Sequence, residues 1–157
     1  MQTAPFPKLR EAERVSRIFE RDGEIRYAAC STFSFGAHVI DYPTMFVLGA
    51  TVYIVPEDVR KSAAALEDFI EKYIINSTFV SPQLLRMFRF TNTHKIRITA
   101  GGERMSNIPV RDNVELYNLY GMSETLIVTS HLTEKQSSNV PIGKALGGVT
   151  VTICGDD

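Results

Sequence analysis

The sequence lacks the features that mark disulfide-rich, zinc-binding and membrane proteins. It has two cysteines in 157 residues, Cys30 and Cys154, and they are too far apart for a disulfide framework or a zinc motif. No apolar run is long enough to cross a bilayer, and the chain does not open with a basic segment followed by an apolar one. We therefore expect an untargeted, cytoplasmic protein without membrane contact.

An excess of either charge is missing too. Seventeen basic residues stand against eighteen acidic ones, which leaves a net charge of -1 and no basic stripe. Nucleic acids and anionic lipids attract proteins through concentrated positive charge. The sequence thus predicts no nucleic-acid partner.

Two common kinds of active site are also absent. A Walker phosphate loop needs G-x-x-x-x-G-K-[ST], but residues 143–145 lack its first glycine and its hydroxyl residue. His38, His94 and His131 are scattered, with no nucleophile at a motif spacing, and we interpret them as surface or packing residues.

Helical periodicity is present in several segments. Residues 9–22 are charge-rich with apolar residues at helical spacing, and we take residues 1–23 as an amphipathic helical lead-in. Ser62 can cap a second helix, and Ser81-Pro82 combines a cap with a first-turn proline. Pro43 interrupts the apolar pattern of residues 39–48, so the secondary structure of this segment stays open. The second helix has apolar side chains at i, i+3, i+4, i+7 and i+8: Leu66, Phe69, Ile70, Tyr73 and Ile74.

Strand patterns alternate with these helices. Residues 51–55 read as a buried strand that Pro56 ends. This alternation implies βαβ units, so we expect an α/β, flavodoxin-like doubly wound sandwich with a mostly parallel sheet of about five strands flanked by helices. Ligands of such sheets bind beyond the carboxyl ends of the strands. The other predicted strands are residues 24–30, 77–80, 96–100, 115–120 and 149–153.

Two predicted strand ends carry unusual residues. Gly101 and Gly102 are adjacent, which lets a ligand lie directly on the backbone. Residues 118–125 combine an amide, an aromatic ring, a glycine, a hydroxyl and a carboxylate. This set suits a nucleotide with a hard cation, because Asn118 can read an adenine edge and Glu124 can hold magnesium. The residue types alone leave open a surface loop whose polar groups occur by accident.

The segment Asn118-Leu119-Tyr120-Gly121-Met122-Ser123-Glu124 resembles the N-x-Y-G-x-T-E signature of nonribosomal peptide synthetase adenylation domains, with methionine and serine in place of proline and threonine. Phe33-Ser34-Phe35-Gly36 resembles the F-x-F-D segment of that family, and Thr99-Ala100-Gly101-Gly102-Glu103 resembles its adenine-side turn. Residues 49–54 and 141–144 match further segments in the family's order. The resemblance spans about residues 24 to 155.

The resemblance implies that residues 24–157 are the acyl- and adenine-binding subdomain of an adenylation domain, and that this subdomain is incomplete. The family reaction joins a carboxylic acid to ATP as an acyl adenylate, with magnesium, and passes the acyl group to a phosphopantetheine thiol of a carrier protein. The rest of the adenylation domain would be a further partner. We expect no catalytic residue within this chain and no turnover by it alone.

The resemblance also assigns roles to individual residues. Gly36 stands where members that activate α-amino acids carry an aspartate that pairs with the substrate ammonium. The missing aspartate predicts an apolar acid substrate without that amine. The alternative is that the pocket no longer selects any acyl group. Asp41 is not expected to replace this aspartate. The nucleotide site would comprise Gly101, Gly102, Glu103, Asn118, Tyr120, Gly121 and Ser123, and the magnesium ligand would be Glu124. The acyl pocket would comprise Gly36, Ala37, Ile40, Phe79, Ile98, Ala100, Leu119, Ile127 and Val128.

Fold alone leaves two other functions open, because a flavodoxin-like sheet can hold a flavin or a nucleotide without adenylation. One is a non-catalytic nucleotide-binding module. The other is a degenerate fragment that persists only as a folding unit or an interaction surface.

Overall fold

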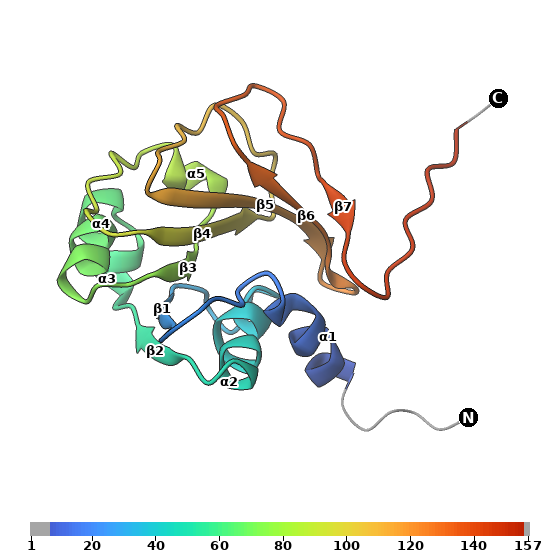
Figure 1. Cartoon of the computed structure of the whole chain (residues 1–157), viewed down its shortest axis with the longest axis horizontal. Coiled ribbons are helices and arrows are strands. Elements are labelled where there is room, and N and C mark those ends of the chain that lie inside the picture. Colours follow the sequence, from blue (N-terminus) through green and yellow to red (C-terminus); the bar gives the residue numbers. More distant parts are fainter. Residues whose placement is uncertain (1–6, 156–157) are drawn as a thin grey trace.

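The computed structural model describes residues 7–155, with side chains from residue 11 onward. Within this range the sheet has seven strands in the order β2-β1-β3-β4-β5-β6-β7 (Figure 1). The strands are β1 (Arg26–Ala29), β2 (Thr51–Ile54), β3 (Ser77–Phe79), β4 (Ile96–Gly101), β5 (Val114–Met122), β6 (Leu126–Thr133) and β7 (Lys144–Ala145). The first five pair in parallel with one another and follow the flavodoxin-like order 2-1-3-4-5, which confirms the predicted fold.

Helices cover both faces of the sheet (Figure 1). One face carries α1 (Pro7–Ser16), the π-helix η1 (Ile40–Thr44) and α2 (Met45–Val47), while the other carries α4 (Ala63–Lys72) and α5 (Pro82–Leu85). The short α3 (Glu57–Arg60) packs beside α4. Each face has its own buried cluster, and we call the one under α4 and α5 the first core and the other the second core. α1 belongs to the second core through the fully buried Val15 of the helix and Phe19 just beyond it.

Local sequence signals explain where the main helices begin. The Ser62 hydroxyl accepts a hydrogen bond from the Ala65 N–H, and the Ser81 hydroxyl accepts one from the Leu84 N–H, so both predicted caps are confirmed. α4 ends at Lys72, earlier than its apolar periodicity suggests. Ile74 has a φ of 50° and is exposed, because the turn after the helix directs the chain into β3.

One predicted strand is absent, another is a strand but is not buried, and two strands were not predicted. Residues 149–153 form no strand; the chain beyond β7 has no partner there, and Ile153 is 93% exposed. β2 lies at the edge of the sheet and pairs with β1, so the expected burial fails and Ile54 is 72% exposed. β6 pairs antiparallel to β5 after a tight turn, and neither β6 nor the short β7 beside it was among the predicted strands.

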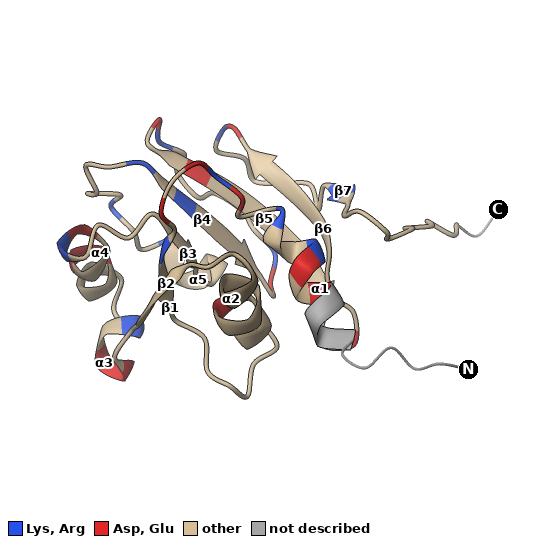
Figure 2. Cartoon of the chain, turned by 60° about the horizontal axis from the view of Figure 1, so that its bottom comes forward, with Lys and Arg blue, Asp and Glu red and all other residues tan. Residues whose placement is uncertain are grey.

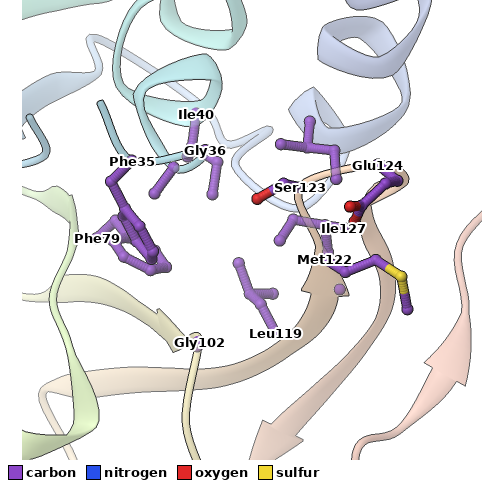
Figure 3. A pocket seen from close by; sticks show the side chains of 14 residues that line it. Phe35, Gly36, Ile40, Phe79, Gly102, Leu119, Met122, Ser123, Glu124 and Ile127 are labelled. Carbon is purple, nitrogen blue, oxygen red and sulfur yellow. The ribbon is translucent and has the colours of Figure 1, made fainter. Parts of the chain in front are cut away.

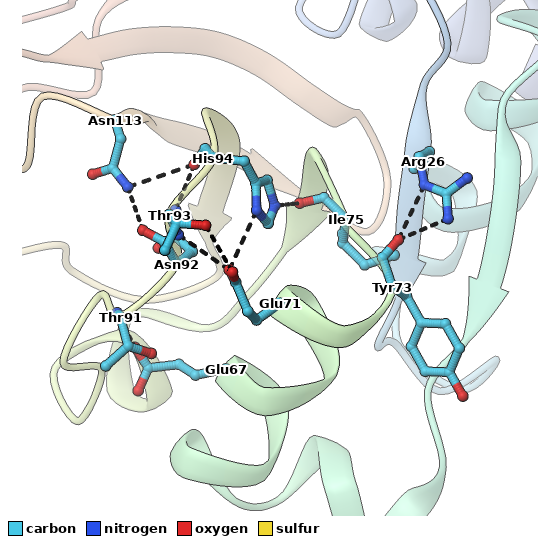
Figure 4. Close-up of polar contacts among 10 residues, drawn as sticks. All are labelled: Arg26, Glu67, Glu71, Tyr73, Ile75, Thr91, Asn92, Thr93, His94 and Asn113. Atoms are coloured by element: carbon cyan, nitrogen blue, oxygen red, sulfur yellow. Dashed lines mark hydrogen bonds and ion pairs between the residues drawn. The ribbon is translucent and has the colours of Figure 1, made fainter.

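Two carboxylates on α4 hold the loop that leads into β4 (Figure 4). Glu67 is buried and accepts hydrogen bonds from the backbone N–H groups of residues 89–91. One turn later, Glu71 accepts from the Thr93 hydroxyl and N–H, which lower the pKa of its carboxyl group. His94 Nδ1 lies 3.3 Å from Glu71 Oε2, and His94 Nε2 lies 2.7 Å from the Ile75 carbonyl. These contacts fix the start of β4, and so the position at which it ends.

Charges of both signs occur on the helices. Figure 2 shows Lys or Arg together with Asp or Glu on α1, α3 and α4. Among the helices of residues 7–155, none is both long enough and apolar enough for a bilayer crossing.

Candidate functional site

The glycine turn and the aromatic segment meet at the carboxyl edge of the sheet. The parallel register places Ala100 beside Asn118 and Gly101 beside Leu119, so the glycine turn after β4 begins beside the last part of β5. The predicted adjacency of these two segments is therefore confirmed. In a 2-1-3-4-5 sheet this edge is the expected ligand site.

An apolar cavity of about 330 Å³ lies at this edge (Figure 3). The loop after β1 forms one wall, the ends of β3, β4 and β5 form the floor, and the start of β6 closes the far side. Glu124 is the one carboxylate among the described residues that line it. The lining consists of Phe35, Gly36, Ala37, Ile40, Phe79, Gly101, Gly102, Leu119, Gly121, Met122, Ser123, Glu124, Leu126 and Ile127.

A second, more polar cavity of about 390 Å³ adjoins the first. The two cavities share Gly102, Leu119 and Gly121. One ligand with an apolar half and a polar half can therefore span both. The polar cavity is lined by Gly102, Glu103, Arg104, Met105, Asn118, Leu119, Tyr120, Gly121, Asn139, Val140 and Ile142.

The two side chains that suit a nucleotide base lie in the polar cavity. Asn118 is buried, and its Nδ2 donates a hydrogen bond to the Pro141 carbonyl at 2.8 Å. Its amide oxygen and the second N–H of Nδ2 can both serve a ligand, and an amide oxygen accepts from an exocyclic amine. Tyr120 is 43% exposed, which leaves its ring accessible for stacking.

Close backbone approach explains two of the glycines. A Cβ on Gly101 would lie 2.4 Å from the Leu119 carbonyl oxygen. A Cβ on Gly121 would lie 1.6 Å from the Leu126 carbonyl oxygen, because β5 is irregular between Tyr120 and Gly121. Both positions therefore exclude any side chain.

Ser123 and Glu124 lie in the exposed turn between β5 and β6. Arg14 on α1 fastens this turn, since its Nη2 donates to the carbonyls of Thr125 at 3.2 Å and Ile127 at 3.1 Å. No three His, Cys, Asp or Glu side chains gather as a metal site within residues 7–155. Glu124 could thus hold magnesium only together with water and ligand phosphates, which is how proteins commonly bind this ion.

The structure gathers most of the predicted site residues, with three exceptions. Ile98 and Ala100 point to the opposite face of β4 and pack in the first core under α4 and α5. Val128 lies outside both cavities. The sequence had given no sign of Arg104 and Asn139 in the polar cavity, or of Arg14 behind the Glu124 turn. Phe35 could have been found, because it belongs to the Phe33–Gly36 motif.

Asp41 is a buried carboxylate next to the apolar cavity. It is fully buried, and its Oδ1 accepts from the Tyr27 hydroxyl at 2.8 Å while its Oδ2 accepts from the Ser31 N–H at 2.7 Å. Burial raises the pKa of Asp41 to about 6, although these hydrogen bonds work against the rise. Both oxygens are engaged by the protein, which agrees with the expectation that Asp41 does not replace the missing aspartate at Gly36.

Asp41→Asn should remove a pH dependence of stability. Because the folded protein holds the Asp41 proton more tightly than the unfolded chain, the free energy of unfolding falls as pH rises from about 4 to about 6 and is flat above. An asparagine can keep both hydrogen bonds without the charge. We expect the variant to gain roughly 2–3 kcal/mol relative to the native protein between pH 4 and pH 7, as measured by urea unfolding. A difference that is constant with pH would contradict this.

Comparison with known proteins assigns the family. The family model for "AMP-binding enzyme" matches residues 8–157. The chain belongs to the AMP-binding enzyme family. It is 27% identical over 142 residues to bacitracin synthase 1 of Bacillus licheniformis, with 89% of this chain and 3% of that protein covered. It is 30% identical over 146 residues to nonribosomal peptide synthetase asaC of Aspergillus flavus, with 84% of this chain and 14% of that protein covered. The resemblance to nonribosomal peptide synthetases is thereby confirmed.

Solved structures of related fold agree with the architecture. A four-domain nonribosomal peptide synthetase bound to AMP and glycine superposes with a TM-score of 0.76 at 19% identity, over 89% of this chain and 11% of that one. The N-terminal subdomain of Klebsiella oxytoca NpsA in complex with anthranilyl-AMSN gives 0.68 at 20% identity, over 88% of this chain and 40% of that one. The chain thus spans a small part of these larger proteins.

Proposed function

We propose that the chain is the acyl- and nucleotide-binding part of an ATP-dependent enzyme that converts a carboxylic acid to its acyl adenylate. The observation that carries the proposal is the pair of adjoining cavities, one apolar and one polar, which share a wall of Gly102, Leu119 and Gly121. An acyl adenylate has the same two halves. Membership of the AMP-binding enzyme family supports the polar half as the place of the nucleotide.

In this proposal the polar cavity holds the AMP portion. The Tyr120 ring stacks on the adenine, and the Asn118 amide oxygen accepts from the adenine amino group. The backbone at Gly101 and Gly102 lies against the ligand, and Glu103 and Gly121 complete the wall. Ser123 and Glu124 line the apolar cavity next to the shared wall, and from there Ser123 donates to the α-phosphate and Glu124 contributes to magnesium binding, which offsets the phosphate charge.

The apolar cavity holds the acyl group in the same proposal. Gly36, Ala37 and Ile40 form its wall after β1, and Phe79, Leu119 and Ile127 complete it. A cavity of about 330 Å³ is near the lower end of the roughly 300–1,000 Å³ common for small-ligand sites. An α-ammonium would lack a buried countercharge here, so the substrate is an apolar carboxylic acid without that amine.

The proposed reaction balances in two steps. A carboxylate oxygen of the acid attacks the α-phosphorus of ATP, a new P–O bond forms, and pyrophosphate leaves as the old P–O bond breaks. A phosphopantetheine thiol of a carrier protein then loses its proton to water and attacks the acyl carbon, so that a C–S bond forms and AMP leaves as the acyl C–O bond breaks. This chain binds and orients both halves of the adenylate, and we expect the remaining part of an adenylation domain to be required for turnover.

Ligand titration tests the proposal against a flavin-binding module. We expect calorimetry to detect binding of AMP, and tighter binding of isocaproyl sulfamoyladenosine, a stable mimic whose acyl chain is leucine without its amine. FMN should not bind, since the apolar cavity offers few partners for the polar edges of a flavin ring. Binding of FMN with no binding of AMP would overturn the proposal, and binding of neither would favour a degenerate fragment.

Glu124→Gln should separate metal-dependent from metal-independent binding. The change removes the charge that holds the cation and keeps the shape of the side chain. We expect ATP affinity in the presence of magnesium to fall by about tenfold and AMP affinity without magnesium to stay within about twofold. Glu134→Gln, which alters an exposed carboxylate outside both cavities, is the control and should leave both affinities unchanged. An equal loss under both conditions would assign Glu124 a structural role.

A further inference from the structure

The wall of the apolar cavity that follows β1 is one short loop. We call residues 31–41 the cavity loop; it carries four of the lining residues, Phe35, Gly36, Ala37 and Ile40. Residues 32–35 are exposed, and Phe33 is 73% exposed. In the first half of this loop the Phe33 ring stacks on Tyr42 with 4.9 Å between ring centroids, and the other side chains of residues 32–35 are exposed and pack little against the core.

The Asp41 carboxylate joins the two ends of the cavity loop. Its Oδ2 accepts from the N–H of Ser31 at 2.7 Å, and its Oδ1 accepts from the hydroxyl of Tyr27 at 2.8 Å. Tyr27 is a fully buried residue of β1 and packs edge-on against Phe19 of the second core. One side chain thus closes the loop and ties it to a fixed point of the sheet.

The far side of the cavity loop touches the site itself. The Phe35 ring lies next to Gly102, where an added Cβ would be 3.3 Å from Phe35 Cζ. Gly36 lies beside Ser123, where an added Cβ would be 3.8 Å from Ser123 Oγ (Figure 3). A shift of the loop would therefore open the apolar cavity and leave Asn118 and Tyr120 in place.

We infer that Asp41 is a positioning residue for the acyl group: its carboxylate fastens the cavity loop over the apolar cavity, so that acyl binding, and not nucleotide binding, depends on it. The inference rests on the proposed function of the apolar cavity. The two hydrogen bonds require no charge, because an asparagine can accept from the Ser31 N–H and donate to the Tyr27 oxygen. An alanine can make neither.

Affinities for AMP and for isocaproyl sulfamoyladenosine separate the two halves of the site. For Asp41→Ala we expect AMP binding within about twofold of the native protein and a loss of at least about tenfold for the acyl compound. Asp41→Asn should restore the acyl affinity to within about threefold of the native value. Tyr27→Phe removes one of the two hydrogen bonds with little change in packing and should lie between the two, and it carries the test if the alanine variant fails to fold.

Hydrogen exchange of the free protein gives a readout that needs no ligand. We expect backbone amides of residues 31–38 to exchange at least about tenfold faster in Tyr27→Phe and Asp41→Ala, with β4 and β5 unchanged. Equal loss of both affinities, an unchanged acyl affinity, or faster exchange throughout the sheet would overturn the inference. A native protein that binds neither compound would instead refute the proposed function, while the exchange data would still decide whether Asp41 fastens the loop.

Discussion

Gly121→Ala should abolish nucleotide binding and strongly destabilise the end of the β5–β6 hairpin. The new Cβ would lie 1.6 Å from the Leu126 carbonyl oxygen and 2.6 Å from its carbonyl carbon, so β5 and β6 would have to separate. These are backbone atoms that cannot rotate away. We expect a loss of about 3–4 kcal/mol in the free energy of unfolding, which is at the upper end for a single substitution.

The same separation would displace both cavities, because Gly121 lines each of them. AMP affinity should fall by at least about a hundredfold in calorimetry. Gly155→Ala is the matched control, since a Cβ there meets no atom within 4 Å. If Gly121→Ala unfolds at the same midpoint temperature as the native protein, the hairpin relaxes at no cost, and this prediction is refuted.

Gly36→Asp should convert the apolar cavity from a preference for deaminated acids to a preference for amino acids. The aspartate Cβ fits, because its contact with Ser123 Oγ at 3.8 Å is an ordinary van der Waals distance. Its carboxylate would supply the countercharge that an α-ammonium lacks in the native lining. We expect the ratio of affinities for leucyl over isocaproyl sulfamoyladenosine to rise by at least about a hundredfold, as measured by calorimetry.

We expect the change in preference to come from the charge of the aspartate and not from the size of its side chain. Gly36→Asn adds a side chain of nearly the same shape without the charge, and we expect it to weaken both compounds and leave their ratio within about threefold of the native one. Native protein that already prefers the leucyl compound would sink the proposed substrate class. If the native protein binds both compounds equally well, the result would support the alternative that the pocket no longer selects its acyl group.

The sequence predicted the parts of this protein that depend on chemistry within a few residues. Ser62 and Ser81 cap their helices through hydrogen bonds to N–H groups three residues on, so each signal is complete in four residues. The adjacency of Gly101 to the Tyr120 segment followed from the rule that parallel strands end at a common edge. The same rule predicts that ligands bind at this edge.

The sequence could not tell which strand has a partner. Residues 149–153 alternate as a strand does, yet no strand lies beside them. β6 forms because the turn after β5 brings it back alongside the unpaired edge of β5. β2 has the composition of a buried strand but ends the sheet. Backbone pairing depends on which other segment of the chain lies alongside, and the local residue pattern does not specify that segment.

For the site, the sequence by itself determined the residue types: an amide and a ring in β5, and glycines and two carboxylates at the ends of β4 and β5. The tertiary structure alone decided which face each residue serves, placing Leu119 in the cavity and Ile98 in the first core although both were expected in the acyl pocket. It also brought Arg14 to a turn more than a hundred residues away and set Asp41 between Tyr27 and Ser31. The physical reason is that residue chemistry is local, whereas burial and hydrogen-bond partners are created by packing of segments far apart in the chain.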